Sequence, residues 1–372
     1  MTSSRREFIK AGVVGGAAIA AGVPQVAGAG EEKADFKPLR ILVLGGTGFL
    51  GPHMVREALR RGHDVTLFNR GRTNNALFPD LETIKGDRDN GLDGLKNRKW
   101  DAVVDNSGWV PRHVQDSAHL LAGSCDRYVY TSTVSVYADF KVHNLETSPL
   151  ATIADETVEE VTGETYGPLK ALCEKRAAAE IDADKLTIIR PTYVCGPGDH
   201  TDRFSYWPIR TRNGGEMIWP GSPADVIQII DVRDLANFTI DSIDHNISGI
   251  YNAVNPADEF TMGNMLEISE ALTATMVDPV WISEEFAYEH HLIATGALPI
   301  WSPKAGEYGG AETFSGVAAR NAGLRNRPER ETARDVLSWW DTQDDERRAA
   351  MKAGLTAERE AELIEAWKTR QS

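Results

Sequence analysis

Short apolar runs alternate with longer amphipathic segments along most of the chain. The short runs are rich in Val, Ile, Leu and aromatic residues and are bounded by polar residues or glycine, as buried strands are. The longer segments repeat apolar residues three and four positions apart, as helices that cover a core do. The predicted strands are residues 41–44, 64–68, 82–85, 102–105, 127–130 and 186–189, and the predicted helices include residues 52–61, 111–122 and 168–183. This alternation predicts an α/β fold with a doubly wound parallel sheet, followed by a smaller, mostly helical C-terminal region.

A glycine-rich turn, Gly45-Gly46-Thr47-Gly48-Phe49-Leu50-Gly51, joins the first predicted strand to the first predicted helix. Glycines at this spacing permit a tight turn, close approach of the backbone to a phosphate, and close packing of helix on strand. The helix N-terminus adds free N–H groups and the positive end of the helix dipole. The turn therefore predicts a Rossmann dinucleotide site; a plain tight turn between strand and helix is the alternative. The cofactor residues assigned here are Gly45, Gly48, Phe49, Leu50 and Gly51.

The ends of the second and third predicted strands carry candidates for the adenosine half of such a site. Asn69 stands where NAD-binding proteins place a carboxylate for the ribose hydroxyls, and Arg70 and Arg72 follow it. Two guanidiniums and no carboxylate allow NADP, so the choice between NAD and NADP stays open, and the arginines could equally be solvated loop charges. Asp87, followed by Arg88, is placed to accept a hydrogen bond from the adenine amino group.

Tyr166 and Lys170 are four residues apart in a predicted helix and therefore share one face of it. An ammonium group within about 4–6 Å of the phenol would lower the tyrosine pKa from its usual value of about 10. Tyr166 would then act as a general base toward a substrate hydroxyl. Thr133, just after the fifth predicted strand, could hold the same substrate oxygen.

In this order, these motifs resemble an extended short-chain dehydrogenase/reductase of the NAD-dependent epimerase/dehydratase family. The matching segments are residues 45–51, 86–88, 131–137, 166–170, 190–198 and 230–236, within a resemblance that covers about 39–254. Within the family, residues 65–71 are most similar to the chloroplast stem-loop-binding subgroup.

The resemblance implies that Thr133, Tyr166 and Lys170 form the catalytic triad, with Lys170 also binding the nicotinamide ribose. It further implies a homodimer. The other cofactor contacts that it implies are Asn106, Ser107 and Gly108 after the fourth strand, and Tyr193 and Val194 near the nicotinamide.

Two departures from the family pattern bear on the reaction. The family's 4,6-dehydratases have an Asp-Glu pair directly after the active-site threonine, whereas Val134 and Ser135 follow here, which disfavours dehydration of that kind. Epimerases resembling UDP-galactose 4-epimerase carry an arginine for the substrate diphosphate where this chain has Ile227. The candidate substrate residues are Arg203, Tyr206 and Arg233, which suit a sugar-like ring.

The N-terminus resembles a twin-arginine (Tat) export signal. Arg5 and Arg6 precede a soft apolar run, residues 11–23, and Ala27-Gly28-Ala29 supplies a cleavage site. The expected organisation is a signal at residues 1–29, a linker at 30–38, a dinucleotide-binding core at 39–198, and a substrate-binding and helical region at 199–372, with 226–254 returning to the core. The expected location is the periplasm, with the Tat translocase as a partner during export.

Composition limits the other partners. The formal net charge is −15, and removing residues 1–29, with three basic and one acidic side chain, makes it −17. Such a charge argues against nucleic-acid or anionic-membrane binding, and the chain shows no stretch expected to form a stable membrane anchor. Cys125, Cys173 and Cys195 match no metal-ligand spacing, so no metal is expected and all three are interpreted as buried thiols.

The leading functional hypothesis is an epimerase that oxidises and then re-reduces one carbinol of a sugar-like substrate with tightly bound NAD or NADP. Export favours this reaction, because free nicotinamide cofactor is scarce outside the cytoplasm. The alternative is a net NAD(P)-dependent oxidoreductase or reductase of a small carbonyl or hydroxyl compound. A non-catalytic or RNA-binding relative is the third hypothesis, and the negative charge and the intact Thr133, Tyr166 and Lys170 speak against it.

Overall fold

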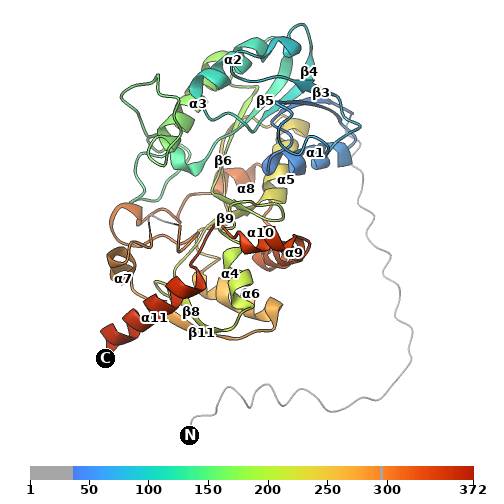
Figure 1. Cartoon of the computed structure of the whole chain (residues 1–372). Coiled ribbons are helices and arrows are strands. Elements are labelled where there is room, and N and C mark those ends of the chain that lie inside the picture. The colour runs from blue at the N-terminus through green and yellow to red at the C-terminus, as the bar shows by residue number, and fades with distance from the viewer. Residues whose placement is uncertain (1–36, 294–295) are drawn as a thin grey trace, which may run out of the picture. The chain divides into compact units, whose positions relative to one another are not determined.

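A parallel sheet of seven strands, in the order β10-β6-β5-β4-β1-β2-β3, organises the computed structural model (Figure 1). The structure describes residues 37–293 and 296–372, so the predicted export signal and nearly all of the predicted linker lie outside the described residues. The strands are β1 (Arg40–Leu44), β2 (Asp64–Asn69), β3 (Thr83–Lys85), β4 (Trp100–Asp105), β5 (Cys125–Thr131), β6 (Leu186–Pro191) and β10 (Gly249–Ala253). Every neighbouring pair is parallel, which confirms the predicted doubly wound Rossmann fold.

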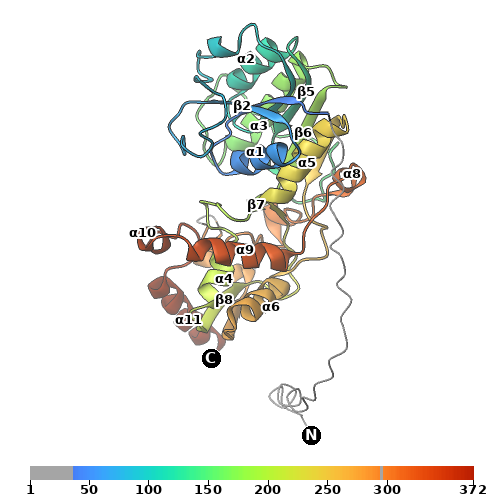
Figure 2. The same ribbon diagram turned by 90° about the vertical axis from the view of Figure 1, so that its right-hand side faces the viewer.

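The alternation of side chains along β1 explains how both faces of the sheet are covered. Ile41 and Val43 belong to a core with α1 and α5, whereas Leu42 and Leu44 belong to a core with α2 and α3 on the opposite face. Figure 2 shows the two helical layers from a second direction. These helices are α1 (Leu50–Arg60), α2 (Pro111–Leu121), α3 (Tyr166–Glu180) and α5 (Val232–Asp244).

The chain leaves the sheet after β6 and returns to it through residues 226–254. In this stretch β9 (Ile229–Asp231) pairs with β7 (Tyr193–Cys195), and β10 adds to the sheet beside β6. The sequence pattern did not predict β10 as a strand. Its pairing gives the sheet its seventh strand.

The remaining elements enclose a second core, built around the rings of Trp207 and Trp219, whose centroids are 4.6 Å apart. The parallel pair of β8 and β11 lies in this mostly helical region and was not predicted. The elements outside the sheet and its covering helices are α4 (Tyr206–Thr211), β8 (Gly215–Pro220), α6 (Met262–Thr273), β11 (Val277–Ile282), α7 (Glu284–Glu289), α8 (Val317–Asn321), α9 (Glu329–Asp341), α10 (Asp345–Ala349) and α11 (Ala357–Gln371), with 3-10 turns at Asp93–Leu95, Val134–Val136 and Gly306–Tyr308.

Among the described residues, no helix has the length and apolar character needed to cross a bilayer. Cys125, Cys173 and Cys195 are buried and free, as predicted.

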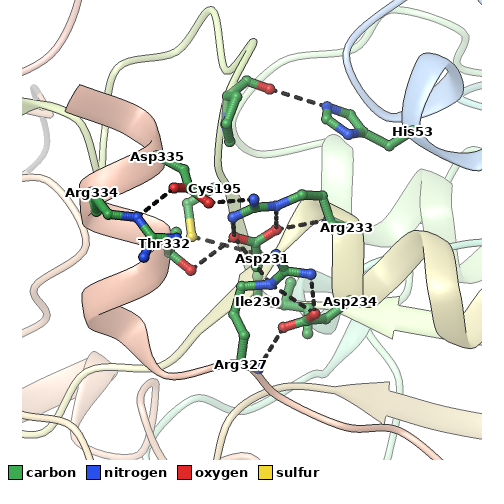
Figure 3. A network of polar contacts seen from close by, with 11 residues as sticks. His53, Cys195, Ile230, Asp231, Arg233, Asp234, Arg327, Thr332, Arg334 and Asp335 are labelled. Carbon is green, nitrogen blue, oxygen red and sulfur yellow. Dashed lines mark hydrogen bonds and ion pairs between the residues drawn. The ribbon is translucent and has the colours of Figure 1, made fainter. Parts of the chain in front are cut away.

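An ion network centred on Asp231 joins α5 to α9 (Figure 3). Asp231 caps the N-terminus of α5 by accepting a 2.8 Å bond from the Arg233 amide, and its other oxygen accepts from the Thr332 hydroxyl of α9 at 2.8 Å. The Arg233 guanidinium bridges Asp231 and Asp335 of α9. Burial opposes ionisation, but the surrounding Arg233 and Arg327 hold the pKa of Asp231 below its ordinary value.

We predict that Asp231→Asn lowers the free energy of unfolding by about 3 kcal/mol at neutral pH, because it removes the buried carboxylate charge that both Arg233 and Arg327 face. A depressed pKa gives stability above the unfolded-state pKa of about 3.9, and this stability is lost as the pH falls through the lower folded-state value. The difference in the free energy of unfolding between the variant and the parent protein, measured by urea unfolding, should therefore become smaller at acidic pH.

The control is Arg334→Ala, which removes an exposed partner of Asp335 and should leave the stability nearly unchanged. The role assigned to the network would be contradicted if Asp231→Asn changed the free energy of unfolding as little as Arg334→Ala does. It would also be contradicted if the difference between Asp231→Asn and the parent protein stayed the same at acidic pH.

Candidate active site

The glycine turn packs as a dinucleotide-binding turn must. Gly45 has φ +91°, and a Cβ on Gly51 would lie 2.4 Å from the Gly45 carbonyl oxygen, so α1 can approach the turn only because that residue is glycine. Gly48 faces open space, with no atom within 4 Å of an added Cβ. Phe49 precedes α1 and makes no side-chain cap, which leaves the N–H groups of the first turn available to a phosphate. The residues therefore fit a pyrophosphate.

At the adenosine end, the Asn69 side chain is engaged in a local turn, where its oxygen accepts from the Gly71 amide at 2.8 Å. This turn leaves Arg70 and Arg72 exposed at the rim of the cavity. Asp87 lines the same end and is partly exposed. The guanidinium groups of Arg70 and Arg72 are therefore available to pair with the 2′-phosphate of NADP, if that cofactor binds.

Arg88 contributes a buried ion pair at the edge of the cavity. Its guanidinium donates to Asp105 at 2.7 Å and to the Ser117 hydroxyl at 2.6 Å, and the Tyr128 hydroxyl donates to the same carboxylate at 2.8 Å. Burial alone would raise the pKa of Asp105, but Arg88 holds it below the ordinary range. The pair fixes the end of β4, from which residues 106–108 continue toward the cavity.

The Lys170 ammonium joins the ends of two strands. It donates to the Gly108 carbonyl beyond β4 at 2.7 Å and to the Thr131 carbonyl of β5 at 2.8 Å, and it lies 4.3 Å from the centre of the Tyr130 ring. Burial lowers its pKa to about 8. The ammonium thus holds the first turn of α3 against the sheet.

Tyr166 begins α3 beside the turn that carries Thr133. The approach is close because residue 167 is glycine, whose added Cβ would lie 2.2 Å from the Ser135 carbonyl oxygen. Thr133 caps the 3-10 turn by accepting from the Ser135 amide at 3.1 Å and donates to the Ser135 hydroxyl at 3.2 Å. Its hydroxyl is also close enough to the Tyr166 phenol to favour the phenolate. The structure thus brings Thr133, Tyr166 and Lys170 together.

The expected lowering of the Tyr166 pKa is not observed. Burial raises this pKa above its ordinary value, and the Thr133 hydroxyl and the charge of Arg203 offset only part of that effect. Lys170 does not act on the phenol because its ammonium is directed to the two strand-end carbonyls. Four-residue spacing places both side chains on one helical face, but it does not fix where a long lysine side chain ends.

One cavity of about 1410 Å³ collects most of the predicted site. Seventeen of the predicted residues line it: Gly45, Gly48, Phe49, Leu50, Gly51, Asn69, Arg70, Asp87, Arg88, Asn106, Ser107, Thr133, Tyr166, Lys170, Tyr193, Val194 and Arg203.

Three predicted residues lie elsewhere. Gly108 takes part through its carbonyl, which binds Lys170 from behind the cavity wall. Tyr206 is 2% exposed in the second core, with its ring 5.1 Å from that of Trp207, because α4 turns this face inward. Arg233 is held in the Asp231 network. The structure therefore does not support Tyr206 or Arg233 as substrate contacts and retains Arg203.

Sequence reasoning missed many residues of the cavity, Trp109 and Glu312 among them. Trp109 is 52% exposed, with its ring centre 5.6 Å from that of Tyr166, and its position directly after Gly108 was the available signal. Asp199 and Glu312 are buried carboxyl residues of the cavity wall. No local pattern marks Glu312, which reaches the cavity only through the tertiary fold.

The substrate side of the cavity is largely aromatic. Trp109, Tyr288 and Tyr308 are exposed there, and Trp301 and Phe314 are buried behind them. Arg203 adds a cation, 4.9 Å from the centre of the Tyr193 ring. Rings interspersed with few polar groups suit a compact substrate that has both apolar faces and hydroxyl groups.

A dinucleotide turn, a strand-end threonine and a tyrosine-lysine helix around one cavity define a nicotinamide-dependent enzyme class. The chain belongs to the NAD dependent epimerase/dehydratase family, whose model matches residues 41–254. The cofactor is accordingly NAD or NADP.

Individual relatives are distant. The chain is 27% identical over 213 residues to the chloroplast stem-loop binding protein of 41 kDa b of Arabidopsis thaliana, a match that covers 53% of each chain. It is 30% identical over 187 residues to 2-alkyl-3-oxoalkanoate reductase of Stenotrophomonas maltophilia, covering 43% of this chain and 52% of the reductase. The chain thus matches about half the length of these curated relatives.

Solved structures share the fold. MoeE5, solved with UDP-glucose and NAD, is 19% identical with a TM-score of 0.56, over 81% of this chain and 98% of that one. The human epimerase family protein SDR39U1, solved with NADPH, is also 19% identical with a TM-score of 0.54, over 82% of this chain and all of that one.

We predict that Gly45→Ala weakens NAD or NADP binding by about tenfold or more, which corresponds to ~1.4 kcal/mol. The added Cβ would lie 2.6 Å from the Ser107 Cβ, and the backbone would be strained at φ +91°. Titration of the purified protein with each dinucleotide measures the effect.

Gly62→Ala is the matched control, because Gly62 has φ +87° but open space around its Cβ. Backbone strain should lower the melting temperature of this variant about as much as that of Gly45→Ala, but its dinucleotide binding should be unchanged. Equal loss of binding in both variants would show that strain alone, rather than the turn, is responsible.

Proposed function

We propose that this protein is an epimerase-type enzyme, which oxidises and re-reduces one secondary carbinol of a sugar-like substrate while retaining NAD or NADP. The observation that carries the proposal is the cluster of Thr133, Tyr166 and Lys170 at the end of β5, facing the same cavity as the glycine turn. When bound, the nicotinamide accepts and returns the hydride.

Proton transfer falls to Tyr166. The Tyr166 phenol and the Thr133 hydroxyl line one cavity, so a substrate oxygen placed between the two hydroxyls can donate to one and accept from the other. Burial raises the Tyr166 pKa and favours the neutral phenol, so Tyr166 must first release its own proton to solvent. The phenolate then takes the hydroxyl proton in the oxidation step, and the phenol returns it to the ketone in the reduction step. Arg203 lies close enough to stabilise the phenolate that forms.

Two features support a redox-neutral reaction on a ring with hydroxyl groups. Aromatic residues and buried carboxyl groups in one wall suit a sugar-like ring. The signal-like N-terminus supports export through the Tat translocase, and an exported enzyme benefits from a cofactor that each turnover regenerates. A homodimer remains part of the proposal through the family resemblance.

A net oxidoreductase of a less polar ring compound is the second candidate. Ile227, at the position where the 4-epimerases carry an arginine, is 0% exposed in the second core and cannot meet a diphosphate. The similarity to an alkyl-oxoalkanoate reductase supports a substrate without a nucleotide.

We predict that Tyr166→Phe lowers turnover by about 10²–10⁴-fold, the usual contribution of a positioned acid-base group, with dinucleotide affinity unchanged. Reduction of the bound cofactor upon addition of sugars and cyclic alcohols identifies a substrate and then measures the rate. Tyr206→Phe is the control, since this hydroxyl is buried in the second core and is not part of the cavity lining. Equal losses in the two variants would contradict the assignment.

We further predict that protein recovered from the periplasm carries NAD or NADP that dialysis does not remove, as mass spectrometry of the native protein would show. Replacement of Arg5 and Arg6 by lysine should retain the protein in the cytoplasm. A freely exchanging cofactor, together with steady NAD(P)H production from an added alcohol, would select the net oxidoreductase instead.

A further inference from the structure

Glu312 is a buried carboxyl group of the substrate-side wall. It lies between the 3-10 turn at Gly306–Tyr308 and α8, and it is 5% exposed. One of its oxygens accepts from the Gln228 amide at 2.9 Å, and the other accepts from the Ser302 hydroxyl at 3.0 Å. These two neutral donors fix the carboxyl group in place without supplying a charge.

Tyr193 is a titratable group that Glu312 acts on, and burial together with Glu312 raises the pKa of Tyr193, so its phenol is neutral. The basic groups of this region are engaged elsewhere. Lys304 pairs with Asp225 at 2.7 Å, and that carboxylate also accepts from the Trp301 indole at 2.9 Å. Arg203 lies over the ring of Tyr193 at 4.9 Å, and it is not among the groups that shift the Glu312 pKa. Within residues 37–293 and 296–372, no basic side chain forms an ion pair with Glu312.

The carboxyl group is therefore buried without a counter-charge. Burial raises its pKa to about 8, and the two hydrogen bonds offset only part of this effect. Ionising such a group costs free energy unless a cation pairs with it, so the carboxyl group keeps its proton at neutral pH until a cation arrives. The missing partner would come from the cavity that Glu312 lines.

The rings around this carboxyl group favour a cationic partner. Tyr193 from β7, Tyr308 from the 3-10 turn, and Trp301 and Phe314 from the chain on either side line the same cavity. Aromatic faces attract ammonium groups, and the attraction increases when water is excluded.

We propose that Glu312 selects substrates that carry a protonated amino group, which it binds as the counter-ion that the protein does not supply. The proposal rests on the proposed function in taking this cavity as the substrate site, and it narrows the substrate class to amines. The balance is one proton: the neutral carboxylic acid releases its proton to solvent, and the ammonium group pairs with the carboxylate that remains.

The test is calorimetric titration of the full protein, loaded with NADP, with cyclohexylammonium and with cyclohexanol, its neutral match. In buffers of different ionisation enthalpy at pH 7, the amine should release about one proton per site, since a group of pKa about 8 is then mostly protonated. The alcohol should bind at least about tenfold more weakly, ~1.4 kcal/mol, and release none.

Glu312→Gln keeps an acceptor and the side-chain shape but cannot ionise. It should lose the amine preference and the proton release while cyclohexanol binding is unchanged. Glu307→Gln is the control, because Glu307 is an exposed carboxylate on the adjacent turn and should leave both properties intact.

Amine binding without proton release, equal affinity for both probes in the parent protein, or the same loss in Glu307→Gln would overturn the proposal. If Glu312→Gln does not fold, infrared difference spectra of the parent protein decide: the band of a protonated carboxyl group should disappear when the amine is added, and a persistent band overturns the inference. None of these measurements needs turnover, so their failure is distinct from failure of the Tyr166 prediction.

Discussion

The Lys170 ammonium, held between two backbone carbonyls, is the contact on which the geometry of the active site depends. It binds the Gly108 carbonyl beyond β4 and the Thr131 carbonyl at the end of β5, so one side chain of α3 sets the spacing of two strand ends. Tyr166 is at the start of the same helix, and Thr133 follows the same strand. Because a buried ammonium group must keep its hydrogen bonds, the positions of Tyr166 and Thr133 follow from the needs of this buried charge.

The central sheet and much of the lining of the cavity were readable from the sequence because their signals are local. The glycines of the turn, the β5 threonine and the tyrosine-lysine pair each lie within a few residues of a strand or helix end, and the fold brings such ends to one edge of a parallel sheet. The same logic failed at Tyr206 and Arg233, where polar residues that looked available proved to be core and network residues. Neither the direction of a short helix nor the partner of an arginine can be read from neighbouring residues.

The substrate wall was the least predictable part for a related reason. Glu312 and Tyr308 reach the cavity from a segment more than 100 residues beyond the tyrosine-lysine helix, and only the packing of the returning chain brings them near Tyr193. The pKa of Tyr166 illustrates a second limit. Its direction depends on how completely the phenol is buried and on where the lysine side chain ends, and spacing along a helix specifies neither. The lining of the cavity and the direction of the Tyr166 pKa shift both depend on tertiary packing, which the spacing of residues along the sequence does not specify.

The Asp231 network has a consequence for how this protein can change over evolutionary time. It ties α9, which packs on the second core, to β9, whose partner β7 carries Tyr193 into the cavity (Figure 3). Substitutions that reshape the second core are therefore transmitted to one substrate-facing strand, while the glycine turn and the tyrosine-lysine helix are anchored separately through the sheet. A lineage can thus alter the proposed substrate side of the cavity while the proposed proton-transfer residues keep their places, but each such change also affects a buried ion network. Substitutions that change the substrate preference should consequently also change the thermal stability of the protein.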